Sequence, residues 1–292
     1  MQNRLLEIKN QESYFAQIVA RYMQFCTSHS NDLESTLSTL SLNDGAFDEL
    51  KLTHIACNAL REQRPNSLNA NSPSNTNDGF ADVPLPSQEM WSILQALRKL
   101  REALLATAAD ALSPLFAQRV HVFGIRLAIL AFHPPSYHPP LMHLLFVLHT
   151  AKFPLPASEL SEMTTYLALD MATRQQDMAA AMRLRANSRS RYNYQNPILD
   201  NLFAAIVSNN WIAFWKIRTS VDGYLRALMY WPSQHMRRHA LKAIGRAYMH
   251  SDVEWIVQSA TGGEMSWEQL VHQEDIGWTL DGSKVVIRKP KA

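Results

Sequence analysis

Basic side chains give the clearest chemical signal in this sequence of 292 residues. One group follows a helical spacing of four residues, and another surrounds the last extended run of the chain. The two groups are Arg238, Lys242 and Arg246, and Lys284, Arg288 and Lys289. Residues four apart share a helix face, and clustered cations attract a phosphate backbone with weak base preference. The sequence therefore predicts contacts to nucleic acid here, with RNA and DNA both open and ordinary solvated surface as the alternative.

A denser basic segment, RLRANSRSRYNY, spans residues 183–194. Its candidate nucleic-acid contacts are Arg185, Arg189 and Arg191. The interleaved Tyr192 and Tyr194 offer rings on which bases can stack. The alternative is a solvated helix end, where Arg interacts favourably with the helix dipole.

Acidic residues dominate the helix predicted over residues 264–272. Glu264 and Glu268 lie in it, and no Lys or Arg does. Phosphates would repel such a recognition helix, so we expect it to dock a protein partner instead. Trp255, Trp267 and Trp278 are expected in the small core of this region, and any of them left exposed would mark a partner interface.

The sequence contains none of the catalytic motifs that we sought: HExxH, GxSxG, the P-loop and GxGxxG. Four histidines cluster between His133 and His149, but no Asp or Glu lies among them. We therefore expect a protein that is not an enzyme and holds no cofactor and no metal. An enzyme with a histidine site is the minor alternative. Cys26 and Cys57 lack CxxC spacing and favour a reducing, intracellular compartment.

Composition indicates a globular, mainly helical chain with 47% hydrophobic residues, only 9 Gly and no apolar run long enough to span a membrane. Asn, Ser, Pro and Asp fill residues 64–87, which predicts a flexible linker after N-terminal helices in 1–63. Apolar spacing over 88–231 predicts an α-solenoid of antiparallel helix pairs. Within it, four prolines predict a loop at 133–140, followed by a helix from Leu141 to about Ala151.

Residues 232–292 differ in character from the helical region before them. A helix over 234–249, with Leu241, Ile244 and Tyr248 on one face, is followed by two short helices and by β-prone runs on either side of Asp281-Gly282. Asp-Gly between two such runs predicts a hairpin with a type I′ turn. Three helices followed by a hairpin are typical of a winged helix.

The arrangement of helical pairs ending in a winged helix resembles the PCI domain. Its matching motifs are Asn210-Trp211 with Phe214-Trp215, Gly223-Tyr224-Leu225, and Arg237 or Arg238 before Ala240-Leu241-Lys242-Ala243, closed by Tyr248. On these motifs, residues 201–250 resemble the core of the GANP family (germinal-centre-associated nuclear protein and its yeast relatives). The Cys-rich N-terminal signature of the mRNA-export branch is absent from this sequence, which leaves a splicing- or transcription-linked relative open.

This resemblance implies a non-catalytic scaffold that pairs with a second PCI subunit, and allows for a small acidic stabilising protein as well. It implies a nuclear setting, with the cytoplasm also open, and a role in mRNA processing or export through RNA binding. Gly277-Trp278 resembles the small PCI subunits of the signalosome, the proteasome lid and an initiation-factor complex, which are the alternative. A stand-alone winged-helix nucleic-acid binder is a further alternative.

Overall fold

A computed structural model describes residues 7–28, 88–107 and 113–288, and these are mainly helical with a small three-stranded antiparallel sheet. They form two compact units. Unit 1 comprises the chain up to Leu167 together with Asp222–Ala227, and unit 2 comprises Ala168–Val221 together with the chain from Leu228. The predicted linker at 64–87, and Lys289, lie outside the described residues.

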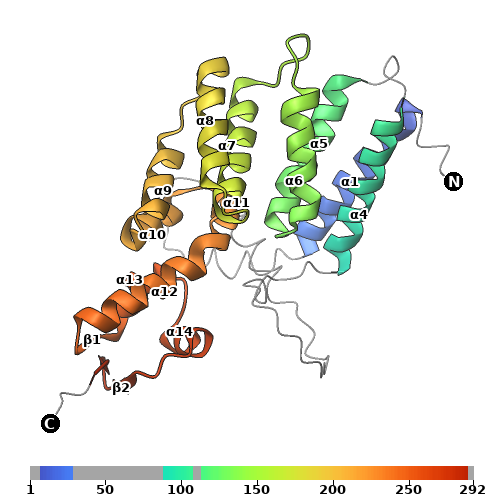
Figure 1. Ribbon diagram of the computed structural model, residues 1–292. Helices are drawn as coiled ribbons and strands as arrows, with labels where there is room; N and C mark the ends of the chain where they lie inside the picture. The colour runs from blue at the N-terminus through green and yellow to red at the C-terminus, as the bar shows by residue number, and fades with distance from the viewer. Residues whose placement is uncertain (1–6, 29–87, 108–112, 289–292) are drawn as a thin grey trace, which may run out of the picture. The chain divides into compact units, whose positions relative to one another are not determined.

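Unit 1 is built from helices that pack against their neighbours in the chain (Figure 1). They are α1 (Ile8–Ser28), α4 (Gln88–Ala106), α5 (Pro114–Leu130), α6 (Pro134–His143) and the π-helical η2 (Leu144–Leu148). Two further helices, α7 (Ala157–Thr173) and α11 (Gly223–Leu228), contribute residues to both units. The buried side chains of α4 recur three or four residues apart from Met90 to Leu104, so the spacing predicted this helix correctly.

The N-terminus of α5 also follows from the sequence. The Ser113 hydroxyl accepts the backbone N–H of Phe116 at 3.5 Å, and Pro114 occupies the first helical turn, where its missing N–H has no consequence. α5 is buried on most of its surface, including Gln118 and His121. The Gln118 side-chain amide donates to the carbonyls of Leu148 and Phe153, at 3.0 and 2.9 Å. The amide nitrogen therefore keeps its hydrogen bonds although the residue is buried.

The predicted loop at 133–140 is wrong, because these residues form most of α6. Pro134 and Pro135 occupy the first turn of α6, where prolines are tolerated. Pro140 lies inside the helix and cannot donate to the carbonyl four residues earlier, which belongs to Ser136. Arg101 of α4 replaces the missing donor, because its Nη1 lies 2.8 Å from the Ser136 carbonyl oxygen. A tertiary contact therefore completes a helix that local rules exclude.

The helix predicted from Leu141 to Ala151 is also not a separate element. Leu141 belongs to α6, and the chain then continues as the π-helical turn Leu144–Leu148. The backbone N–H of His149 bonds to the carbonyl of Leu144, five residues earlier, at 2.9 Å. Such π-turns widen a helix locally.

Unit 2 begins with the end of α7 and continues through further helices, of which α9 and α10 pack against each other. Its next helices are α8 (Met178–Tyr192), α9 (Pro197–Val207), α10 (Trp211–Ser220) and α12 (Tyr230–Ala247). Side chains of Asp177, Asn196 and Asn210 accept a backbone N–H at the N-termini of α8, α9 and α10. The Asp177 cap begins α8 as a helix separate from α7, which ends at Thr173.

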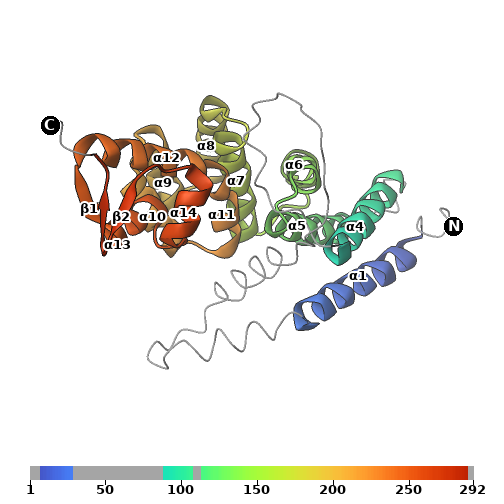
Figure 2. The ribbon, with the colours of Figure 1, turned by 90° about the horizontal axis from the view of Figure 1, so that it is seen from below.

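The end of unit 2 alternates helices with short strands. After α12 come β1 (His250–Asp252), α13 (Val253–Thr261), α14 (Trp267–Glu274), β2 (Thr279–Asp281) and β3 (Lys284–Val286). The strands pair antiparallel in the order β1-β3-β2, and Figure 2 shows β1 and β2 beside α13. The predicted hairpin is confirmed, but Asp281 pairs with Lys284, so the turn residues are Gly282 and Ser283. Only Gly282 of these two has a positive φ, of 59°, whereas a type I′ turn needs two positive φ angles.

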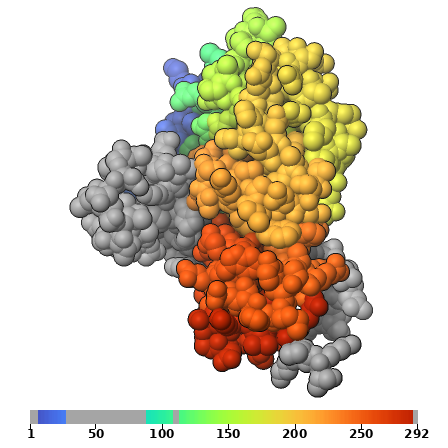
Figure 3. Space-filling view, turned by 90° about the vertical axis from the view of Figure 1, so that its left-hand side faces the viewer, coloured from blue at the N-terminus to red at the C-terminus, as the bar shows by residue number. Residues whose placement is uncertain are grey.

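A compact hydrophobic cluster holds these last elements together. It unites α12, α13, α14 and β3 through Ala240, Leu241, Ile244, Ile256, Ala260, Leu270 and Val285. Partly buried rings at Trp267 and Trp278 pack against it. Figure 3 shows one face of this end of the unit in orange and red.

We predict that Arg101→Met lowers the free energy of unfolding by about 1–3 kcal/mol, because the Ser136 carbonyl loses its donor. Pro140→Ala restores a backbone N–H four residues after Ser136, so adding it to Arg101→Met should recover part of the loss. Urea denaturation of the two single variants and the double variant measures this coupling. Strictly additive effects would contradict the role assigned to Arg101.

Candidate nucleic-acid and partner-binding surfaces

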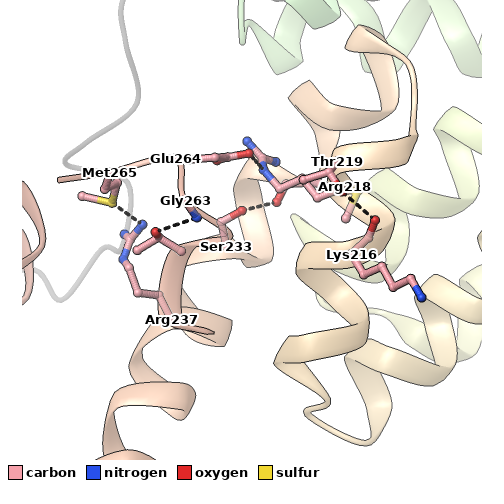
Figure 4. A network of polar contacts seen from close by, with 10 residues as sticks. Lys216, Arg218, Thr219, Ser233, Arg237, Gly263, Glu264 and Met265 are labelled. Atoms are coloured by element: carbon pink, nitrogen blue, oxygen red, sulfur yellow. Dashed lines mark hydrogen bonds and ion pairs between the residues drawn. The ribbon is translucent and has the colours of Figure 1, made fainter. Parts of the chain in front are cut away.

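A buried carboxylate joins α12 to α14 in unit 2. The Glu274 side chain is only 2% exposed and accepts hydrogen bonds from the Nε of Arg237, at 2.6 Å, and of Arg238, at 2.8 Å. Arg237 is itself buried and also contacts Met265 Sδ at 3.3 Å (Figure 4). Arg238, the first residue of the predicted basic stripe, is more than half exposed, but its charge is compensated within the unit.

A second ion pair ties α10 to the segment before α14. Arg218 Nε lies 2.7 Å from Glu264 Oε1 (Figure 4). The Arg218 side chain is 10% exposed and that of Glu264 is 34% exposed. Glu264, predicted to bind a partner, is therefore engaged in an internal contact and lies before the first residue of α14, Trp267.

The remaining basic residues of α12 point to solvent. Lys242 and Arg246 are both exposed, and no ion pair within the described part of the chain involves either of them. Arg288 donates from its guanidinium to the carbonyl of Gly245, with Nε at 2.8 Å. This contact satisfies a carbonyl at the C-terminus of α12 and places a third positive charge beside Arg246.

Lys284 is exposed on β3 between two acidic neighbours. The strand register pairs it with Asp252 of β1 on one side and with Asp281 of β2 on the other. Directly paired residues in antiparallel strands project from the same face of the sheet. The positive charge of Lys284 is thus flanked by two carboxylates, which weakens its attraction for a phosphate.

The α8 helix carries the densest positive charge in unit 2. It contains four arginines and no acidic residue. Arg185 pairs with Asp200 at 2.5 Å, whereas Arg183, Arg189 and Arg191 are exposed. Of the two tyrosines predicted to stack on bases, Tyr192 is 46% exposed but Tyr194 is only 7% exposed. Tyr194 therefore contributes to packing rather than to a binding surface.

On the acidic side, Glu268 is the most accessible predicted partner-binding residue. Hydrogen bonds from its own backbone N–H and from Ser266 lower the pKa of the Glu268 carboxyl. The Ser266 hydroxyl and the Gln269 amide form a capping box at the start of α14. Trp267 and Trp278 are half-buried, and Trp278 approaches α12 so closely that a Cβ on Gly245 would lie 3.2 Å from its ring.

Sequence reasoning missed an aromatic pair on the surface. Trp255 was expected in the small core, and Tyr248 on the apolar face of its helix. Instead Trp255 is 41% exposed and Tyr248 is 44% exposed, and their ring centroids lie 5.2 Å apart. The buried residues of α13 indicate why: Ile256 and Ala260 define its inner face, and Trp255 lies on the opposite side. This helical phase was the signal available in the sequence.

The histidines that cluster in the sequence do not converge on one point. His133 Nδ1 contacts the Ser136 hydroxyl at 2.8 Å, whereas His149 Nδ1 accepts the backbone N–H of Leu155 at 3.0 Å. His143 lies beside His121, with ring centroids 5.2 Å apart. No group of three or more potential metal ligands occurs among the residues that the structure describes.

Unit 1 contains a cleft of about 400 Å³ between α1 and α5. Phe15, Tyr22 and Phe123 line it, and Arg126 lies at its edge. Arg126 is held by Glu162 of α7, with Nε 2.8 Å from Oε1, so its charge is compensated.

Neither a protein-family model nor a curated protein matches the chain. In the described residues, no helix combines the length and the hydrophobicity needed to cross a bilayer.

We predict that Glu274→Gln lowers the free energy of unfolding by about 3 kcal/mol, because Arg237 then remains buried without a full counter-charge. Glu268→Gln, on the same helix but exposed, is the matched control and should have a smaller effect. Guanidinium denaturation followed by circular dichroism measures both. Equal losses for the two variants would show that burial of the Glu274 pair is unimportant.

Unit 1 should lose stability in mild acid because of His121. Burial lowers the pKa of His121 to about 4, with smaller contributions from His143 and Arg101. Since the unfolded chain binds a proton near pH 6.5, the stabilisation is complete above that pH and is lost as the pH falls toward 4. We expect the free energy of unfolding to fall by about 2 kcal/mol between pH 7 and pH 5.

His121→Gln should reduce this dependence of stability on pH, whereas His272→Gln, at an exposed position, should leave it unchanged. If His121→Gln kept the pH dependence of the wild type, the assignment to His121 would be wrong.

Proposed function

We propose that this chain is a non-catalytic scaffold subunit of the PCI kind, which pairs with a second PCI protein and helps to bind RNA in nuclear mRNA processing or export. The observation that carries the proposal is the order helix, strand, helix, helix, strand, strand from α12 to β3, with sheet order β1-β3-β2. This order is typical of winged helices, and it follows several helices of the same unit, which supports the proposal.

The charge on α14 supports protein docking over reading of a DNA groove. In a winged helix the helix before the hairpin is the one that enters a groove. Here that helix is α14, which has no Lys or Arg, presents Glu268 to solvent, and is followed by exposed Asp275. A partner with a basic or polar surface fits this face, whereas a phosphate backbone does not.

Two basic surfaces remain for RNA. One is the exposed arginines of α8, and the other is Lys242, Arg246 and the guanidinium of Arg288 at the end of α12. Each is modest, so a composite surface completed by the partner accounts for RNA binding better than this chain alone.

A second candidate is a small PCI subunit of a signalosome, proteasome-lid or initiation-factor complex. It is favoured by Gly277-Trp278, because the Trp278 ring packs against Gly245 of α12 and so gives this motif a structural role. Both candidates share the fold and the partner-docking face.

Affinity purification of the full chain followed by mass spectrometry tests the proposal. We expect recovery of a subunit that itself ends in a winged helix, and we expect Glu268→Lys to reduce that recovery at least about tenfold through charge reversal at the docking face. Glu254→Lys, an exposed change on α13, is the control and should retain the partner.

Undiminished recovery with Glu268→Lys would contradict docking through α14. Recovery of mRNA-processing proteins and RNA in the purified complex would support the first candidate. Recovery of proteasome-lid, signalosome or initiation-factor subunits would support the second candidate. Strong, steeply salt-dependent RNA binding by the isolated chain would instead indicate a stand-alone binder.

A further inference from the structure

We propose that Tyr248 and Trp255 form a stacking platform for the unpaired bases of a single-stranded nucleic acid. This inference rests on the proposed RNA-binding function and narrows its ligand to single strands. It assigns the contact to two aromatic rings rather than to the basic hairpin.

The two rings are placed by short, well-fixed connections. Tyr248 directly follows α12, Trp255 is the third residue of α13, and β1 lies between them. β1 pairs antiparallel with β3, so that His250 lies opposite Val286 and Asp252 lies opposite Lys284. This pairing fixes the connection between the two rings. The rings meet at an interplanar angle of 66°. They are therefore held in position before any ligand arrives.

Both rings are also unusually exposed for their type. Neither is part of the hydrophobic cluster of α12, α13, α14 and β3 or of the rings packed on it. Met249, next to Tyr248, is 44% exposed as well. Three large apolar side chains close together on a surface indicate a binding site rather than ordinary packing.

The charges around the rings favour a nucleic acid as the occupant. Arg246 precedes Tyr248 by two residues, Lys242 lies one helical turn earlier, and Arg288 is held against the Gly245 carbonyl. Of the nearby acids, Asp252 faces Lys284 across the sheet, which leaves Glu254 as the main opposing charge. Cations beside exposed rings match a polymer of phosphates and flat bases.

A single strand fits this surface better than a duplex. In a duplex the faces of the bases are stacked on one another, so only unpaired bases can lie on a protein ring. The acidic α14 also opposes insertion of this region into a groove. The platform should therefore bind unpaired nucleotides, while Lys242 and Arg246 contact their phosphates.

Fluorescence anisotropy with a labelled 12-nucleotide oligouridine tests this, using the full chain alone and with the partner recovered by purification. We expect Trp255→Ala and Tyr248→Ala each to weaken binding about tenfold, and Trp255→Phe, which keeps a ring, to weaken it less. The slope of affinity against salt should stay unchanged in these variants, because no phosphate contact is lost. Lys242→Ala and Arg246→Ala should instead reduce that slope by about one each.

Trp91→Ala is the matched control, because Trp91 is 42% exposed and also contacts one ring, that of His133, at 5.2 Å. It should bind like the wild type. A 12-base-pair duplex should bind more weakly than the single strand, and its affinity should change little in Trp255→Ala. A 12-nucleotide oligodeoxyuridine, compared with the oligouridine, tells whether the platform prefers RNA or DNA. Circular dichroism confirms that each variant is folded.

Normal oligouridine binding by both ring variants, with loss in Lys242→Ala and Arg246→Ala, would overturn the platform and leave the proposed function intact. Loss of partner recovery in Trp255→Ala, with RNA affinity unchanged, would make the surface a protein-docking site and also overturn the inference. Absence of any nucleic-acid binding, with and without the partner, would overturn the inference and the RNA-binding part of the proposed function, while partner recovery would still test the scaffold role.

Discussion

The end of unit 2 depends on one requirement: a carboxylate removed from water must be paired. Glu274 meets it with Arg237 and Arg238, which fixes the end of α14 against α12. The hydrophobic cluster alone is non-directional and would tolerate some sliding of the helices. The charged hydrogen bonds of Glu274 restrict how α14 can shift along α12. They thereby help to fix the positions of the strands, the acidic helix and the aromatic pair.

This requirement also determines which cations are left for binding. Arg218, Arg237 and Arg238 are engaged by carboxylates, Arg288 caps the end of α12, and Lys284 lies between two aspartates. A count of basic residues therefore overstates the positive surface of the hairpin. Among the described basic residues that the sequence predicted to contact nucleic acid, those that face water without an ion pair or a flanking carboxylate lie on α8 and at the end of α12.

The sequence predicted features set by local spacing and missed those set by tertiary contacts. Apolar periodicity identified α4, and the β-prone runs around Gly282 identified the hairpin. Four prolines predicted a loop because no local rule anticipates that Arg101, 35 residues away, supplies the missing donor. The buried partner of Arg238 was likewise invisible, since a stripe of charges does not reveal which of its members meet a carboxylate. Trp255 was misplaced because size, rather than helical phase, was used to assign it to the core.

The same core carries opposite charges at its two ends. Arg237 and Glu274 join the middle of α12 to the acidic α14, while Arg246 lies roughly 13 Å further along, near the C-terminus of α12, which Tyr248 directly follows. A partner docked on Glu268 would then leave the basic and aromatic end accessible. Because α12, α13 and α14 share one hydrophobic cluster, a partner docked on Glu268 and a strand bound at Tyr248 and Trp255 would both be held by elements of the same core. Such an arrangement suits a scaffold subunit, whose contribution is to hold two ligands in a fixed relation.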